Sequence, residues 1–88
     1  MTKWVRRADW VGSQVEDQYV MIHVESGRYM ALNETATAAW HLLETPQDEA
    51  ALTSALMDKF DVDQATCARS VATLIGTMTE SAMIEPAG

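Results

Sequence analysis

One stretch of sequence decides the fold of this chain: YMALNETATAAWHLL, which runs from Tyr29 to Leu43. Leu32 closes an extended segment. Asn33 then suits the N-cap of a helix, because its side-chain oxygen can accept a hydrogen bond from a free amide of the first turn. The apolar residues that follow keep the spacing of one buried helix face: Ala36, Ala39, Trp40 and Leu43. The stretch therefore predicts a strand that leads directly into an amphipathic helix.

The residues before this stretch have an extended pattern. We expect strands at 11–15, interrupted by Gly12, at 18–24 and at 28–32. The second strand is the clearest, because its residues alternate between two faces. One face carries Val20, Ile22 and Val24, and the other carries Tyr19, Met21 and His23. The loop at 25–27 ends in Gly27, which suits a left-handed conformation in a hairpin. Three strands joined by short loops predict an antiparallel meander.

The residues after the stretch have a helical pattern. The first helix is expected from Asn33 to about Glu44. Thr45 suits the cap of a second helix and Pro46 its first position, because the missing amide of proline is not needed there. A third helix is expected from Asp63 to about Ser81. Its main apolar stripe consists of Cys67, Val71, Leu74 and Met78.

Together these elements predict one α+β domain over residues 1–88, with a three-stranded antiparallel sheet followed by three helices. The outline is that of a winged helix. Residues 1–9 are expected to form a loose N-terminal arm that Trp4 anchors to the core. Met83 and Ile84 are expected to end the fold, with fraying of the residues that follow.

The chain is acidic and has an ordinary apolar content. Its 88 residues are 48% hydrophobic, which favours a globular domain. Its 13 acids against 6 bases give a net charge of −7, which opposes binding to phosphate backbones. A winged-helix DNA-binding protein needs a basic third helix and wing. Here the expected third helix has only Arg69 and the possible wing only Arg28, so the sequence disfavours DNA binding.

The expected cellular location follows from the absence of targeting and membrane-spanning segments in the sequence. The basic residues near the start are not followed by the apolar run of a secretory signal. The hydrophobic runs are far shorter than a membrane span. Cys67 is the only cysteine, which suits a reducing compartment. We therefore expect a cytoplasmic protein that does not contact a membrane.

Catalysis is not expected from these residues. Cys67 lies on an apolar stripe, where cysteine usually acts as a small buried hydrophobe. His23 and His41 lie in different elements, with no cysteine or acid at metal-ligand spacing. The glycines are too far apart to form a phosphate-binding loop. The sequence therefore predicts no enzyme, no metal site and no bound cofactor.

The strand at 28–32 leads to a binding hypothesis. A three-stranded meander has two edges, and this strand can be one of them. An edge strand presents unpaired amides and carbonyls that another chain can join. A groove between such an edge and the third helix is a common way to capture an extended peptide. The alternative is an edge that is simply solvated or blunted by Arg28, and the residues alone favour neither.

In this order, the residues resemble the PqqD-like superfamily. The resemblance covers roughly Gln18 to Ile84. The residues that carry it are Tyr29-x-x-Leu32-Asn33-x-x-Ala36, Trp40, the helix restart from Thr45 to Glu49, Leu52, Leu56, Phe60, Val71, Leu74, Met78 and Met83-Ile84. This superfamily contains the recognition elements of pathways that make ribosomally synthesised, post-translationally modified peptides.

The resemblance implies a small winged-helix-like domain without catalytic activity. Such domains bind the leader region of a precursor peptide as a further strand beside the third strand and against the third helix. The corresponding residues for strand addition are Arg28, Tyr29, Met30 and Ala31. Those for the helix wall are Cys67, Ser70, Val71 and Leu74. Ser70 stands where family members often carry an acid, so a salt bridge of that acid is not carried over to this chain.

Two branches of the superfamily remain to be distinguished. The chaperone of pyrroloquinoline quinone synthesis usually has a Pro-Glu-Gly turn before its third strand, whereas this chain has Glu25-Ser26-Gly27. The segment Gly27-Arg28-Tyr29, which leads to Leu32-Asn33, is more similar to the stand-alone recognition proteins of lasso-peptide pathways. The same is true of the tryptophan at position 40. That branch implies a leader peptidase of the cysteine-protease type as partner and a cyclase downstream. The alternatives are a peptide chaperone for a radical SAM or other peptide-modifying enzyme and a structural subunit.

Overall fold

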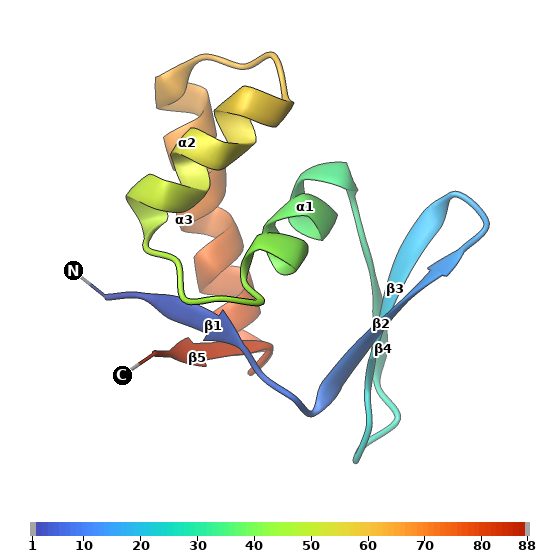
Figure 1. The fold of residues 1–88 in the computed structure, drawn as a ribbon. Helices are drawn as coiled ribbons and strands as arrows, with labels where there is room; N and C mark the ends of the chain where they lie inside the picture. The colour runs from blue at the N-terminus through green and yellow to red at the C-terminus, as the bar shows by residue number, and fades with distance from the viewer. Residues whose placement is uncertain (1, 88) are drawn as a thin grey trace.

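The computed structural model describes residues 2–87, which form a three-stranded sheet, three helices and a short terminal strand pair (Figure 1). The elements are β1 (Trp4–Arg6), β2 (Trp10–Val15), β3 (Gln18–His23), β4 (Tyr29–Leu32), α1 (Glu34–Leu42), α2 (Glu49–Lys59), α3 (Gln64–Glu80) and β5 (Ile84–Pro86). This order confirms the expected α+β fold, with a three-stranded antiparallel sheet followed by three helices.

The sheet has the strand order β2-β3-β4, and every neighbouring pair is antiparallel. Met21 pairs with Gly12 on one side and with Met30 on the other, and its side chain is fully buried. The expected interruption at Gly12 is wrong, because β2 runs through it without a break. The ring of Tyr19 occupies the space that a side chain at position 12 would need. A side chain at position 12 would therefore displace this ring.

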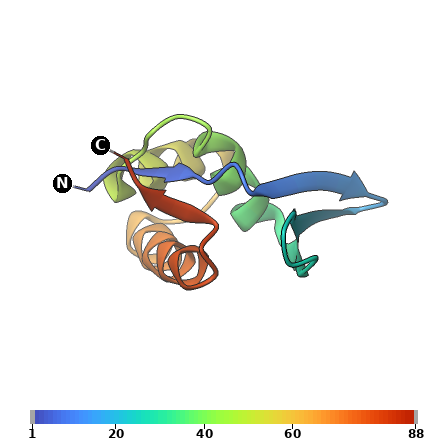
Figure 2. The ribbon, with the colours of Figure 1, turned by 90° about the horizontal axis from the view of Figure 1, so that it is seen from below.

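The opposite face of the sheet is exposed to solvent. Across it, Val11 pairs with Ile22, and Ile22 pairs with Tyr29. These three side chains are all exposed. The views in Figures 1 and 2 agree that the β2–β3 hairpin extends away from the helices, so the helices cover only part of the sheet.

The first helix begins as expected and the second does not. The side chain of Asn33 accepts a hydrogen bond from the Ala36 amide at 2.8 Å, which confirms it as the N-cap of α1. The N-cap of α2 is Asp48 instead of Thr45. The reason is that Gln47 forms an isolated antiparallel bridge with Trp4. The Gln47 amide donates to the Trp4 carbonyl at 2.9 Å, which keeps this segment extended.

The two ends of the described chain are paired with each other. β1 and β5 are antiparallel, and Trp4, Val5 and Arg6 lie opposite Pro86, Glu85 and Ile84. The expectations of a loose N-terminal arm and of fraying after Ile84 are therefore wrong within residues 2–87. Trp4 packs against the core and Ile84 is buried, so both strands are held by apolar contacts as well as hydrogen bonds. Met1 and Gly88 lie outside the described residues.

One core joins the three helices, the inner face of the sheet and β5. Its larger side chains are Trp10, Met21, Trp40, Leu43, Leu52, Leu56, Val71, Ile75, Met78, Met83 and Ile84. Trp10 links the sheet to the segment before β5, because its indole Nε1 donates to the Ala82 carbonyl at 3.1 Å. Within residues 2–87, no helix is long and apolar enough to cross a bilayer.

Polar contacts fix the link between β1 and β2. The Arg7 guanidinium contacts Asp9 at 3.2 Å and Glu85 at 3.3 Å. The Asp9 carboxylate also lies 3.2 Å from Nε2 of His23. The hydrogen bond from Arg7 is the main cause that lowers the pKa of Asp9 below its ordinary value. The link therefore ties the terminal strand pair to the three-stranded sheet.

Candidate functional site

β4 is an edge strand, because β3 is its partner on one side and no described strand pairs with it on the other. The register shows which backbone groups are free. The His23 amide donates to the Arg28 carbonyl at 2.7 Å. Since partners in an antiparallel pair alternate, Met30 and Leu32 direct their amides toward β3. The amides and carbonyls of Tyr29 and Ala31 then point away from the sheet, toward the open edge.

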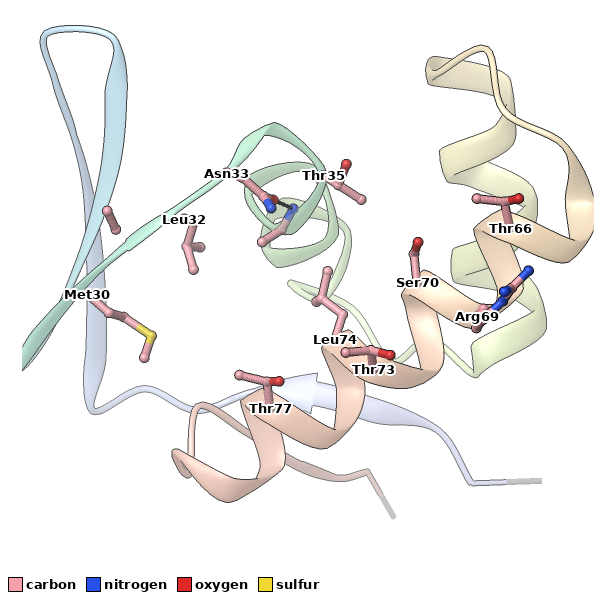
Figure 3. Close-up of a pocket in the computed structure, with 12 residues that line it drawn as sticks. Met30, Leu32, Asn33, Thr35, Thr66, Arg69, Ser70, Thr73, Leu74 and Thr77 are labelled. Atoms are coloured by element: carbon pink, nitrogen blue, oxygen red, sulfur yellow. Dashed lines mark hydrogen bonds between the residues drawn. The ribbon is translucent and has the colours of Figure 1, made fainter.

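An open groove of about 660 Å³ lies between this edge and α3 (Figure 3). One wall consists of β4 and the start of α1, and the other is one face of α3. The residues of the first wall are Met30, Ala31, Leu32, Asn33, Thr35 and Ala36. Those of the second wall are Thr66, Arg69, Ser70, Thr73, Leu74 and Thr77.

The α3 wall follows from the amphipathic pattern of that helix. Cys67, Val71, Ile75 and Met78 are buried and hold α3 to the core. The residues between them at helical spacing turn to the groove, and most of them carry hydroxyl groups. Leu74 is half-buried and lies where the two faces meet. Across from it, Met30 and Leu32 are half-buried on the inner face of the sheet.

The groove is therefore apolar along its base and polar along its α3 side. Its shape is suited to an extended chain, because backbone groups are available at the β4 edge and side-chain contacts along the helix.

The structure brings together four of the eight residues expected at the site. Met30, Ala31, Ser70 and Leu74 line the groove. The side chains of the other four lie elsewhere, although the backbone of Tyr29 is at the open edge of β4. Arg28 lies over the ring of Trp10, with 5.9 Å between its guanidinium carbon and the ring centroid, and Tyr29 exposes its side chain on the outer face of the sheet. Cys67 and Val71 are buried on the core side of α3.

Several groove residues were not expected from the sequence: Leu32, Asn33, Thr35, Ala36, Thr66, Arg69, Thr73 and Thr77. Those on α3 could have been found from the same periodicity that gave the buried stripe. They are the residues on the opposite side of a helix whose core face was already assigned. Those at the start of α1 carry no such signal, because the groove reaches them only through the tertiary arrangement.

Reactive chemistry is not assembled around the groove. Cys67 is buried, and its thiol donates to the carbonyl of Thr53 at 3.5 Å. Among residues 2–87, no group of three or more His, Cys, Asp or Glu side chains is placed to hold a metal ion. The described lining therefore offers binding groups and no nucleophile–base pair.

Comparison with known proteins places the fold in a family. A family model described as coenzyme PQQ synthesis protein D (PqqD) matches residues 18–84. No match is found among curated proteins. Among solved structures, TbiB1 in complex with the TbiA(beta) leader peptide is 20% identical, with a TM-score of 0.80 over 96% of this chain and 98% of that chain. Lasso peptide synthetase B1 complexed with the leader peptide is 24% identical, also with a TM-score of 0.80, over 94% of this chain and 98% of that chain. The chain belongs to the PqqD family.

Proposed function

We propose that this protein binds the leader region of a ribosomally made precursor peptide in lasso-peptide biosynthesis. In this proposal the leader adds as a strand to β4, and the protein presents it to enzymes that cleave or modify the precursor. The observation that carries the proposal is the free edge of β4 beside the groove of α3. The protein itself acts as an adaptor and catalyses no reaction.

Strand addition uses the groups that the fold leaves available. The outward amides and carbonyls of Tyr29 and Ala31 hydrogen-bond to the leader backbone and set its register. Alternate leader side chains then turn toward α3, because side chains on a strand point to opposite faces in turn. Apolar side chains among them contact Met30, Leu32 and Leu74, which supplies selectivity.

The lasso-peptide branch is supported by the two similar structures, since both are B1-type proteins bound to leader peptides. The alternative within the family is a PqqD-type chaperone for a radical SAM or other peptide-modifying enzyme. The proposed partners are a leader peptidase of the cysteine-protease type and a cyclase, all in the cytoplasm. The whole chain acts as one leader-binding domain.

The first test is binding. The probe is a fluorescein-labelled leader of a short precursor peptide encoded in the same gene neighbourhood. Fluorescence anisotropy is expected to show saturable binding of this leader at near-physiological salt, and no comparable binding to labelled duplex DNA. Tight DNA binding that falls steeply with salt would instead identify a nucleic-acid-binding protein, because such binding releases counterions.

The second test separates an adaptor from an enzyme. Cleavage of the precursor is measured with the neighbouring peptidase alone, with this protein alone and with both. We expect cleavage to be fastest with both proteins and absent with this protein alone. Cleavage by this protein alone, retained in the Cys67→Ala variant, contradicts the adaptor role.

A third test locates the leader. Backbone amide shifts in a titration with the leader are expected to change most at residues 29–31 and along the groove face of α3. Changes that cluster instead on α1 and α2, around Trp40 and Leu52, contradict binding at the β4 edge.

A further inference from the structure

The groove contains one charged side chain, and it is a cation. Among the described residues that line it, Arg69 alone has a formally charged side chain. We infer that the bound peptide carries an acidic side chain that pairs with Arg69, at a fixed distance from an apolar side chain held beside Met30. This inference rests on the proposed peptide binding and adds the chemical class of the peptide.

Arg69 is available for such a pair. Arg7 is held by Asp9 and Glu85, and Arg6 lies against Trp40, with 5.3 Å between its guanidinium carbon and the ring centroid. In the described part of the chain, Arg69 forms no ion pair and no side-chain hydrogen bond, and it is exposed.

A surface arginine on a helix can pair with an acid three or four residues away, because those side chains are its neighbours on the helix surface. The corresponding positions around Arg69 are Ala65, Thr66, Ala72 and Thr73. α3 therefore supplies no internal partner for this cation.

The charge of the groove differs from that of the chain. The chain has 13 acids and 6 bases, yet no acid is among the described residues that line the groove. Ser70, next to Arg69, carries no charge, so the local charge of the groove is positive.

A carboxylate of the bound peptide suits the chemical groups around Arg69. The guanidinium can bind both oxygens of a carboxylate at once. Thr66 and Thr73 lie one helical turn before and after Arg69 on the same face, and either hydroxyl group can donate to a carboxylate held near it. The arginine therefore selects for an acidic partner and against a basic one.

The position of the acid follows from the length of the groove. Arg69 and Thr66 lie toward one end, and Met30 and Thr77 lie toward the other (Figure 3). Arg69 and Thr77 are eight residues apart on α3, which corresponds to about 12 Å along the helix axis. An extended peptide rises about 3.3 Å per residue, so this length spans about four residues. Because four is an even number, both side chains lie on the same face of the added strand.

The test needs no knowledge of the natural leader. The probe is an mRNA-display library of random 12-residue peptides, selected against the immobilised full chain. Parallel selections use Arg69→Gln and Arg69→Glu. Lys59→Gln is the matched control, because it removes one exposed positive charge that does not line the groove.

With the wild-type chain and Lys59→Gln, we expect enrichment of Asp or Glu about four residues from an apolar side chain. Arg69→Gln should lose the acidic preference, and Arg69→Glu should replace it with Lys or Arg. A selected acidic peptide should bind Arg69→Gln about 1.5- to 5-fold more weakly than wild type, the range of an exposed ion pair. That difference should shrink as salt is raised.

The outcomes separate this inference from the proposed function. Peptides that bind at the β4 edge with no acidic preference, or with one that Arg69→Gln leaves unchanged, overturn the role of Arg69 and leave peptide binding intact. If no selected peptide shifts the amides of residues 29–31, both proposals fail.

Discussion

Proline substitutions at two adjacent positions of β4 should separate folding from peptide binding. In the register of the sheet, the Met30 amide faces β3 and the Ala31 amide faces the open edge. Ala31→Pro therefore removes a donor that only an added strand can use. Proline is tolerated on such an edge, since no ladder hydrogen bond within the fold is lost. Ala31→Val is the matched control, because it enlarges the side chain and keeps the amide.

The magnitudes follow from the groups that change. Ala31→Pro removes one hydrogen bond to the leader and leaves a leader carbonyl without its partner. We expect leader binding to weaken by about 1–3 kcal/mol, or about 5- to 150-fold, while the free energy of unfolding changes by less than about 0.5 kcal/mol. Met30→Pro removes a donor to β3 and a half-buried side chain. It should destabilise the fold by about 3 kcal/mol or more.

Two measurements suffice for this prediction. Urea denaturation followed by circular dichroism gives the free energy of unfolding, and fluorescence anisotropy with the labelled leader gives the affinity. If Ala31→Pro is folded and binds the leader as tightly as Ala31→Val, then the leader does not pair with β4 at this position. If instead Ala31→Pro is as unstable as Met30→Pro, the register derived for β4 is wrong.

Three further predictions concern stability, each measured by urea denaturation. Asn33→Ala should cost about 1 kcal/mol because α1 loses its N-cap acceptor; an unchanged midpoint would show that the cap contributes nothing. Gly12→Ala should destabilise the fold by about 1–3 kcal/mol by displacing the ring of Tyr19, whereas Gly76→Ala, which meets open space on α3, should stabilise it by about 0.5–1 kcal/mol. Equal effects at the two glycines would contradict this packing. Asp9→Asn should lower stability at pH 7. Because the folded pKa of Asp9 is lowered, its contribution is fully present above the unfolded value of about 3.9 and is lost as the pH falls through the folded value. A stability difference between wild type and Asp9→Asn that does not shrink as the pH is lowered below about 3.9 would contradict this linkage.

The elements that the sequence predicted well are those that repeat a pattern. The alternation in residues 18–24 and the helical spacing after Asn33 gave the sheet and α1 with small errors in their bounds. The pairing of β1 with β5 was missed because each strand has only three residues. Alternation cannot be recognised over three residues, and no local signal connects the two ends of a chain. The cap of α2 was misplaced for a similar reason, since the bridge between Gln47 and Trp4 is a long-range contact.

The candidate site could be predicted in outline and only partly in detail. A meander followed directly by helices indicates that one strand lies at an edge, and the structure places β4 there. The resemblance assigned Cys67 and Val71 to the helix wall, although both belong to the apolar stripe of α3 and are buried on its core side. Arg69 was considered only as evidence on DNA binding. Its place in the groove depends on the rotation of α3 about its axis, which the core packing of that helix determines.

The strand pair of β1 and β5 also determines how this domain can be joined to other proteins. The Ala87 amide donates to the Lys3 carbonyl at 2.8 Å, so the chain enters and leaves the fold at nearly the same point. In Figure 1 this point lies on the opposite side of the molecule from β4. A domain with adjacent ends can be inserted into a surface loop of a host protein or circularly permuted with little strain. Fusion to an enzyme at either end would leave the groove open, and the tether would raise the local concentration of a captured peptide at that enzyme without any new contact.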